Sequence, residues 1–257
     1  MTGPSPTLCD VPTSLRVAIA ACLSSTLMLA ACGGSGSEGS SASKSSSSPA
    51  AASQVEGLSA EQVVAKAKAA VTSAKSMQYL AKGTDGGKEL TVEMRIDKDR
   101  GALGTIGLAD EQIKLIRTKD AVYVTGNQAL LAAVSGGKPV ATGKWIKTSE
   151  QAPGISSFME LADPGKLLDQ IVKPAQKLSL GTPKTVAGQQ TVAVVIAPDA
   201  SGKNGGTMYV SAQGTPYPLL IESAPGDKDQ GTVTFSDFDK PVDVTAPDAK
   251  DVVVAGS

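Results

Sequence analysis

The side chains able to do nucleophilic or metal chemistry are few, and they lie near the start of the chain. Cysteine occurs only as Cys9, Cys22 and Cys32, and histidine is absent. A body folded from later residues therefore has no disulfide, no thiolate ligand and no imidazole. The Ser-His and Cys-His pairings of hydrolases are excluded with the histidine. We accordingly predict no metal site and no cofactor, and we do not expect an enzyme.

Two acidic motifs have the outline of a functional site but lack a necessary part. Asp97 and Asp99 begin like a calcium-binding loop, but Leu108 occupies the position of the bidentate glutamate, which favours a hairpin turn. Asp237 and Asp239 lie two residues apart near the end of a predicted strand and could form an acid–base pair. Neither a histidine, a cysteine nor a pocket signature accompanies them, so catalysis is disfavoured.

Composition narrows the function further. The chain has 257 residues, 41% of them hydrophobic, which is enough for a real core and rules out wholesale disorder. Its 24 Lys and Arg residues balance 25 Asp and Glu residues without any basic cluster. Only 3% of the residues are aromatic. A nucleic-acid partner is therefore not expected, because such proteins concentrate basic charge or present aromatic platforms to the bases.

Cys32 is the one cysteine in a recognisable context. Arg16 precedes fifteen uncharged residues, 17–31, a stretch too short to span a bilayer but suited to a secretory signal peptide. The sequence Leu29-Ala30-Ala31-Cys32 resembles the lipobox of bacterial lipoproteins. This resemblance implies a diacylglyceryl group on the Cys32 sulfur and cleavage just before it. Two acyl chains suffice for stable anchoring. The alternatives are a plain signal peptide with a coincidental cysteine and a short buried helix.

The residues after Cys32 predict a tether followed by a single folded body. Residues 33–57 are rich in Ser, Gly and Ala and hold almost no large apolar residue, so they cannot offset the entropy of ordering. As a flexible coil they span roughly 25–30 Å. We therefore predict a signal peptide over 1–31, a lipidated cysteine and tether over 32–57, and a lipid-binding domain over 58–257.

The periodicity of the body predicts an α+β fold. Ser59 and Gln62 form a capping-box signal before an apolar pattern of helical spacing that continues to Met77, about 18 residues. Alternating segments joined by short turns then predict an antiparallel meander. Short helices over 127–134 and after Asp163 interrupt that meander. Ten or eleven strands are too many for a flat sheet on one core, so we expect a strongly curved antiparallel sheet. The leading helix and the inserted helical segment would cover its concave face.

The order and spacing of these elements resemble the LppX/LprG lipoproteins of mycobacteria and, more distantly, the LolA/LolB carriers. Besides the lipobox, tether and helices, three segments carry the likeness: 121–124, 185–190 and 240–247. It covers about residues 58–254 and includes no catalytic motif. The resemblance implies a half-open β-barrel around an apolar cavity that holds the acyl chains of lipids or lipoproteins.

Thirteen apolar residues are candidates to line such a cavity. Pattern alone does not separate cavity lining from ordinary core packing, since both place apolar groups inward. The candidates are Leu90, Val92, Met94, Ile96, Ile113, Leu115, Val122, Val124, Phe158, Leu167, Leu168, Ile171 and Val172.

We therefore expect a lipoprotein anchored at the extracytoplasmic face of the cell membrane. It would bind a lipid or glycolipid, for example through a palmitoyl chain, and exchange it with the membrane or with an envelope transporter. The alternative is an interaction or sensor module of a cell-envelope complex, with a filled core and no catalytic activity. An apolar interior void would favour the carrier, whereas an exposed apolar patch over a solid core would favour the interaction module.

Overall fold

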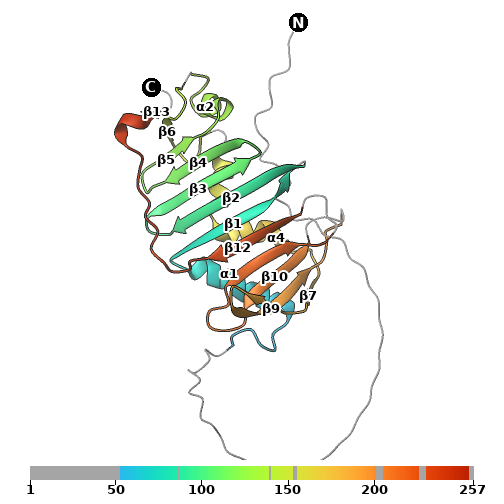
Figure 1. Cartoon of the computed structure of the whole chain (residues 1–257). Coiled ribbons are helices and arrows are strands. Elements are labelled where there is room, and N and C mark those ends of the chain that lie inside the picture. Colours follow the sequence, from blue (N-terminus) through green and yellow to red (C-terminus); the bar gives the residue numbers. More distant parts are fainter. Residues whose placement is uncertain are drawn as a thin grey trace, which may run out of the picture.

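The computed structural model describes residues 53–85, 87–138, 140–152, 155–200, 205–225 and 230–254. These residues form one large sheet with helices packed against one of its faces, which we call the inner face (Figure 1). The predicted signal peptide, Cys32 and most of the predicted tether lie outside the described residues. Val55, near the end of the predicted tether, is 1% exposed and packs into the core.

The first half of the chain forms a helix and then a meander. Helix α1 (Ala60–Ser73) begins with the predicted capping box, in which the Ser59 hydroxyl accepts from the Gln62 amide and the Gln62 side chain accepts from the Ser59 amide. The strands that follow are β1 (Ser76–Asp85), β2 (Lys88–Asp97), β3 (Gly101–Leu108), β4 (Glu111–Arg117), β5 (Val122–Thr125) and β6 (Trp145–Thr148). Each pairs antiparallel with the next, as predicted.

Three short helices separate the two halves of the sheet: α2 (Gln128–Val134) before β6, then α3 (Ser156–Leu161) and α4 (Pro164–Ile171) after it. The side chains of Asn127 and Asp163 cap α2 and α4 by accepting from backbone amides. The second set of strands comprises β7 (Leu178–Leu180), β8 (Thr185–Val186), β9 (Gln189–Ile196), β10 (Gly206–Ser211), β11 (Pro218–Ser223) and β12 (Gly231–Ser236).

Strand β1 joins the two halves, because it pairs with β2 on one side and with β12 on the other. With β13 (Val252–Val254) at one edge, the spatial order is β13-β6-β5-β4-β3-β2-β1-β12-β11-β10-β9-β7, and β8 lies beside β9. The C-terminal segment runs past the strand ends to β13, which pairs parallel with β6 (Figure 1). The sheet is curved and unclosed, which confirms the predicted fold class. The described residues form thirteen strands rather than ten or eleven, because β1 was not predicted and because β8 and β13 are too short to show a pattern in the sequence.

One boundary prediction is wrong. The leading helix has 14 residues rather than about 18, and Met77 lies in β1 instead of on the helix. Ala74 and Met77 are both buried, so the apolar pattern continues past the point where the backbone becomes extended. Strand β1 was consequently missed, although it is the central strand of the sheet.

The inner face is apolar along most of its width. On β2, Leu90, Val92, Met94 and Ile96 are buried, and the residues between them are exposed or half-buried. This alternation follows from the pleat of a strand with one covered face. The buried residues form two clusters, one beneath α1 and α4 and one beneath α2. Both clusters lie between the helices and the inner face.

A cluster of contacts ties the C-terminal segment to the start of β1. The Asp239 carboxylate accepts from the Lys75 amide at 2.7 Å and from the Tyr217 hydroxyl at 2.8 Å. The Tyr217 ring stacks on Phe238, with centroids 3.7 Å apart. The Lys75 amide and then the Tyr217 hydroxyl hold the pKa of the Asp239 carboxyl below its usual value. Burial, and then Asp239, raises the pKa of Tyr217 to about 12.

We predict that these contacts give stability with an acid limit and an alkaline limit. The Asp239 contribution is present above its unfolded pKa of about 3.9 and is lost as pH falls through the lower folded value. The Tyr217 contribution is present below pH 10 and is lost as pH rises toward about 12. The free energy of unfolding, measured in urea at a series of pH values, should fall less steeply toward acid pH in Asp239→Asn. It should fall less steeply toward alkaline pH in Tyr217→Phe. Asp110→Asn, in the turn after β3, is the control, and a parental profile in both test variants would contradict this prediction.

Candidate functional site

The thirteen candidate cavity residues all lie in or against the two inner clusters. Four candidates from β2 and three from α4 are buried in the first cluster, and Val172 packs on it. The second cluster buries Leu115, Val122 and Val124, with Ile113 packed against it. Phe158, on α3, is half-buried and packs against both clusters. The structure therefore places the candidates on one continuous apolar layer rather than at separate places.

Several residues of this layer were not singled out in the sequence. Tyr79 and Phe235 face each other across β1 and β12, with ring centroids 6.2 Å apart. Met208 and Ile221 are buried in the same cluster from β10 and β11. The strands that carry Phe235, Met208 and Ile221 were predicted, whereas β1, which carries Tyr79, was not. The alternation of apolar and polar residues along each strand was the signal that could have identified these inward positions.

Helices α3 and α4 cover the middle of the inner face, and we call them the helical cover. Leu167, Leu168 and Ile171 of α4 all point into the first cluster and are at most 3% exposed. Helix α4 also faces α1, where Lys68 and Asp169 form an ion pair. Both of these side chains are about half exposed, and such pairs contribute little to stability. The cover is therefore held mainly by its apolar side chains.

One described hydrogen bond joins the helical cover directly to the sheet. The Tyr79 hydroxyl donates to the backbone carbonyl oxygen of Leu161, the last residue of α3, at 2.7 Å. Tyr79 has no exposed surface, and its burial raises the pKa of its hydroxyl, which stays protonated as the donor. A buried hydroxyl and a helix-end carbonyl each need a partner. This bond satisfies both groups and fixes the end of α3 above β1.

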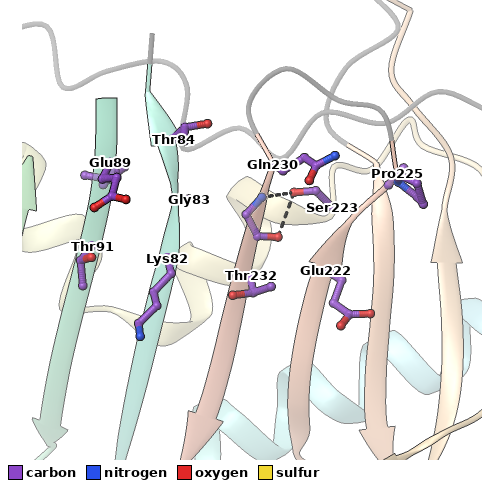
Figure 2. Close-up of a pocket in the computed structure, with 13 residues that line it drawn as sticks. Lys82, Gly83, Thr84, Glu89, Thr91, Glu222, Ser223, Pro225, Gln230 and Thr232 are labelled. Carbon is purple, nitrogen blue, oxygen red and sulfur yellow. Dashed lines mark hydrogen bonds between the residues drawn. The ribbon is translucent and has the colours of Figure 1, made fainter. Parts of the chain in front are cut away.

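A polar depression of about 770 Å³ lies at one end of β1, β2, β11 and β12. Figure 2 shows Lys82 and Thr91 side by side on the neighbouring strands β1 and β2, with Thr232 and Glu222 across from them. The register places these four side chains on the outer side of the sheet, because the residues that alternate with them on each strand are the ones buried beneath the helices. Glu222 is paired with Lys184, with 2.7 Å between the carboxylate and the ammonium. The depression thus offers hydroxyls, amides and both signs of charge to a hydrated ligand group.

Two glycines form the floor of this depression. Gly83 and Gly231 are direct partners across β1 and β12, at positions whose neighbours in register face inward. A Cβ on Gly83 would lie 2.9 Å from the Gln230 carbonyl oxygen. The close approach of these two backbones therefore requires glycine at position 83. The Ser223 hydroxyl bonds to both backbone groups of Gly231, as Figure 2 shows. The inner layer here has no side chains from β1 and β12.

Leu90 links the polar depression to the apolar layer. It pairs with Gly83, is buried in the first cluster, and also lines the depression. Leu90 is the one candidate among those thirteen that lines this depression. Leu115 lines a different one, on the outer face near Trp145. An amphipathic ligand could therefore place an apolar group against the inner face and a polar group in the depression only by passing around the strand ends, since Lys82, Thr91 and Thr232 lie on the outer side.

The acidic motifs have structural roles. The Asp97 carboxylate accepts from the amides of Asp99 and Arg100, which makes the predicted hairpin turn between β2 and β3. Asp237 pairs with Lys240, and Asp239 holds the C-terminal segment as described above. Across the described ranges, no group of three or more acidic side chains is placed to bind a metal ion. No helix in that part of the chain is long and apolar enough to cross a membrane.

Comparison with known proteins finds likeness in structure only. No protein-family model matches the chain, and no curated protein sequence matches it. LprF from Mycobacterium bovis is similar over 73% of this chain and 96% of its own, with 15% identity and a TM-score of 0.47. Lipoprotein LppX from Mycobacterium tuberculosis is similar over 72% and 99%, with 14% identity and a TM-score of 0.46. A LolA superfamily protein from Nitrosomonas europaea covers 72% and 94%, with 10% identity and a TM-score of 0.26. Similarity at these levels does not establish a shared function.

We predict that Tyr79→Phe loosens the helical cover while the sheet stays folded. The substitution keeps the ring but leaves the Leu161 carbonyl without its donor, which should cost about 1–2 kcal/mol of unfolding free energy. Amide hydrogen exchange in α3 should accelerate more than exchange in β2 or β10. Tyr123→Phe, on the face of β5 away from the helices, is the matched control. Equal protection of α3 in the parent and in Tyr79→Phe would show that the hydrogen bond does not hold the cover.

Proposed function

We propose that this chain is a membrane-anchored extracytoplasmic lipoprotein that binds a lipid or lipidated molecule against the inner face of its sheet and hands it on. The observation that carries this proposal is the joining of two environments at Leu90. There the apolar layer of the inner face ends beside the polar depression at the strand ends. No catalytic step is part of this function.

Burial against the inner face would keep acyl chains out of water during transfer. Each methylene on that face is favoured over one in water by about 0.8 kcal/mol but not over one in a bilayer, so an acyl chain would exchange with the membrane at little net cost once the cover has moved. Leu167, Leu168 and Ile171 now fill the space over the sheet. Movement of α3 and α4 away from β1 would vacate that space for a ligand. The Tyr79–Leu161 hydrogen bond would break when the cover moves and form again after release.

The polar depression would receive the headgroup of the ligand. Lys82 would offer an ammonium to a phosphate or carboxylate, and Thr91 and Thr232 would offer hydroxyls to a sugar or glycerol group. Because these three side chains lie on the outer side of the sheet, the headgroup would reach them around the open strand ends. Such groups lose little hydration in an open, polar depression, whereas burying them unpaired would be costly. A lipid or a glycolipid therefore fits better than a fully apolar molecule.

Anchoring and location belong to the same proposal. Cys32 in its lipobox would carry two acyl chains, and the residues up to the folded body would act as a tether of roughly 25–30 Å. The body would then lie close to the outer surface of the membrane from which it draws its ligand. An envelope transporter is the partner we propose for delivery.

A second candidate function also has support. Ten of the thirteen candidate residues are buried and the other three are half-buried, all within clusters of packed side chains. A core filled in this way suits an interaction or sensor module of an envelope complex. The two candidates differ in whether the helical cover gives way to a ligand.

The experiment that separates them is native mass spectrometry of the full Cys32→Ser chain, with and without Val92→Trp. Val92 is buried on the inner face at the centre of β2. If acyl chains occupy this face, the parent should carry lipid. Val92→Trp should then remain folded, carry less lipid and lose under about 1 kcal/mol, since the ring takes ligand space. A permanently filled core would instead lose about 1–3 kcal/mol through overpacking.

The matched control is Thr234→Trp, which places the same ring on an exposed position of β12 facing away from the helices. Its lipid content should equal that of the parent. A parent without lipid, together with a strongly destabilised Val92→Trp, would refute the carrier function and favour the interaction module.

Anchoring is tested separately in cells. Cys32→Ser should either be released from the membrane fraction or accumulate as an unprocessed precursor, because the acceptor thiol is gone. Fractionation with metabolic labelling by a palmitate analogue reports both outcomes, and Cys22→Ser is the control that keeps the lipobox. A correctly processed Cys32→Ser protein that stays in the membrane would contradict the anchoring.

A further inference from the structure

The outer face of the sheet, which none of the described helices covers, carries an apolar and aromatic patch near its β13 edge. We define the outer patch as Leu103, Ile116, Tyr123, Trp145 and Val252. All five side chains are half-buried. Trp145 is the single tryptophan of the chain. Leu103, Ile116 and Trp145 also line a depression of about 350 Å³ on this face.

The strand register places these side chains together. Leu103 is opposite Ile116, Ile116 is opposite Tyr123, and Trp145 is opposite Val252. Residues directly opposite one another point to the same side of a sheet. The inward neighbours of these residues, among them Leu115, Val124 and Ile146, are buried in the second cluster. The outer patch is thus an additional apolar surface, separate from the layer that would hold a ligand.

Positive charge surrounds the outer patch. Lys114 lines the same depression, and Lys147 is opposite Tyr123. Arg95, opposite Leu103, is paired with Glu93, with 2.9 Å between guanidinium and carboxylate. Among the ion pairs of the described residues, none includes Lys114 or Lys147. Because Arg95 and Glu93 cancel, Lys114 and Lys147 leave the outer patch with an excess of positive charge. The chain as a whole has a formal net charge of -1.

We propose that the outer patch docks on a membrane surface that contains anionic lipids. Trp and Tyr have an apolar body and a polar tip, which favours the headgroup level of a bilayer. Lysines around them reach lipid phosphates while their stems lie along apolar surface. Each lysine near an anionic membrane surface raises the partition of the protein onto that membrane about threefold to tenfold. This inference rests on the proposed function for its setting, because an anchored body is always near a membrane.

Docking by the outer patch would orient the body on the membrane. The β13 end would lie against the lipids, and the sheet would keep its inner face and helical cover off the headgroups. A second copy of the chain could also cover an apolar face, but identical lysine-ringed patches would repel each other. Charge therefore favours an anionic bilayer as the occupant.

The test uses the fluorescence of Trp145 in the full Cys32→Ser chain, which lacks the acyl anchor. Vesicles of phosphatidylglycerol should shift the emission to shorter wavelength, and bromine-labelled acyl chains in them should quench it. Vesicles of phosphatidylcholine alone should leave the emission unchanged. Lys114→Glu with Lys147→Glu should weaken the response at least tenfold. The matched control is Lys66→Glu with Lys177→Glu, which makes the same charge change at exposed sites outside the outer patch and should respond as the parent.

Two results would overturn the docking. One is an unchanged Trp145 emission with phosphatidylglycerol, or an equal response to both lipids. The other is an emission shift that depends on protein concentration and not on vesicles, which would make the outer patch a contact between copies. The lipid content of the same samples, read by native mass spectrometry, reports the proposed carrier function independently. Failure of one proposal is therefore distinguishable from failure of the other.

Discussion

The hydrogen bond from the Tyr79 hydroxyl to the Leu161 carbonyl is the contact on which the arrangement of the inner face depends. β1, which carries Tyr79, joins the two halves of the sheet, and α3, which ends at Leu161, begins the cover over the first cluster. The bond is buried, so losing it leaves a polar group without a partner at a cost of about 1–2 kcal/mol. Apolar packing provides the larger area, but this bond fixes where the cover lies.

This combination of apolar packing and one hydrogen bond accounts for how the helical cover could be closed over the sheet and still able to open. An apolar contact between cover and sheet is less directional than a hydrogen bond, and acyl chains could replace it without exposing either surface to water. A single directional bond adds position without adding much strength. Glycines at 83 and 231 leave the inner layer thin beside Leu90, where the polar depression begins. A ligand with a polar end and an apolar end would enter at that point.

Much of this fold is predictable from the sequence, because local signals agree with it. The capping box at Ser59, the caps Asn127 and Asp163, and the alternation on β2 all act over a few residues. β1 was missed because its inward residues run Met77, Tyr79, Ala81 and Gly83, which do not form a uniform apolar row. The parallel pairing of β13 with β6 joins residues about a hundred positions apart, and three valines carry no sign of a partner. For the candidate site, the inward residues were predictable, whereas the polar depression and the Tyr79 bond arise from tertiary contacts alone.

The central claim, that acyl chains bind between the helical cover and the inner face, is tested most directly by photocrosslinking. A phospholipid with a diazirine at the end of its acyl chain would be bound to the full Cys32→Ser chain, irradiated, and mapped by peptide mass spectrometry. We predict crosslinks to inward residues of β2 and to α4, around Met94 and Leu168, in competition with unlabelled lipid. Crosslinks confined to outward residues, or none that unlabelled lipid displaces, would contradict the claim.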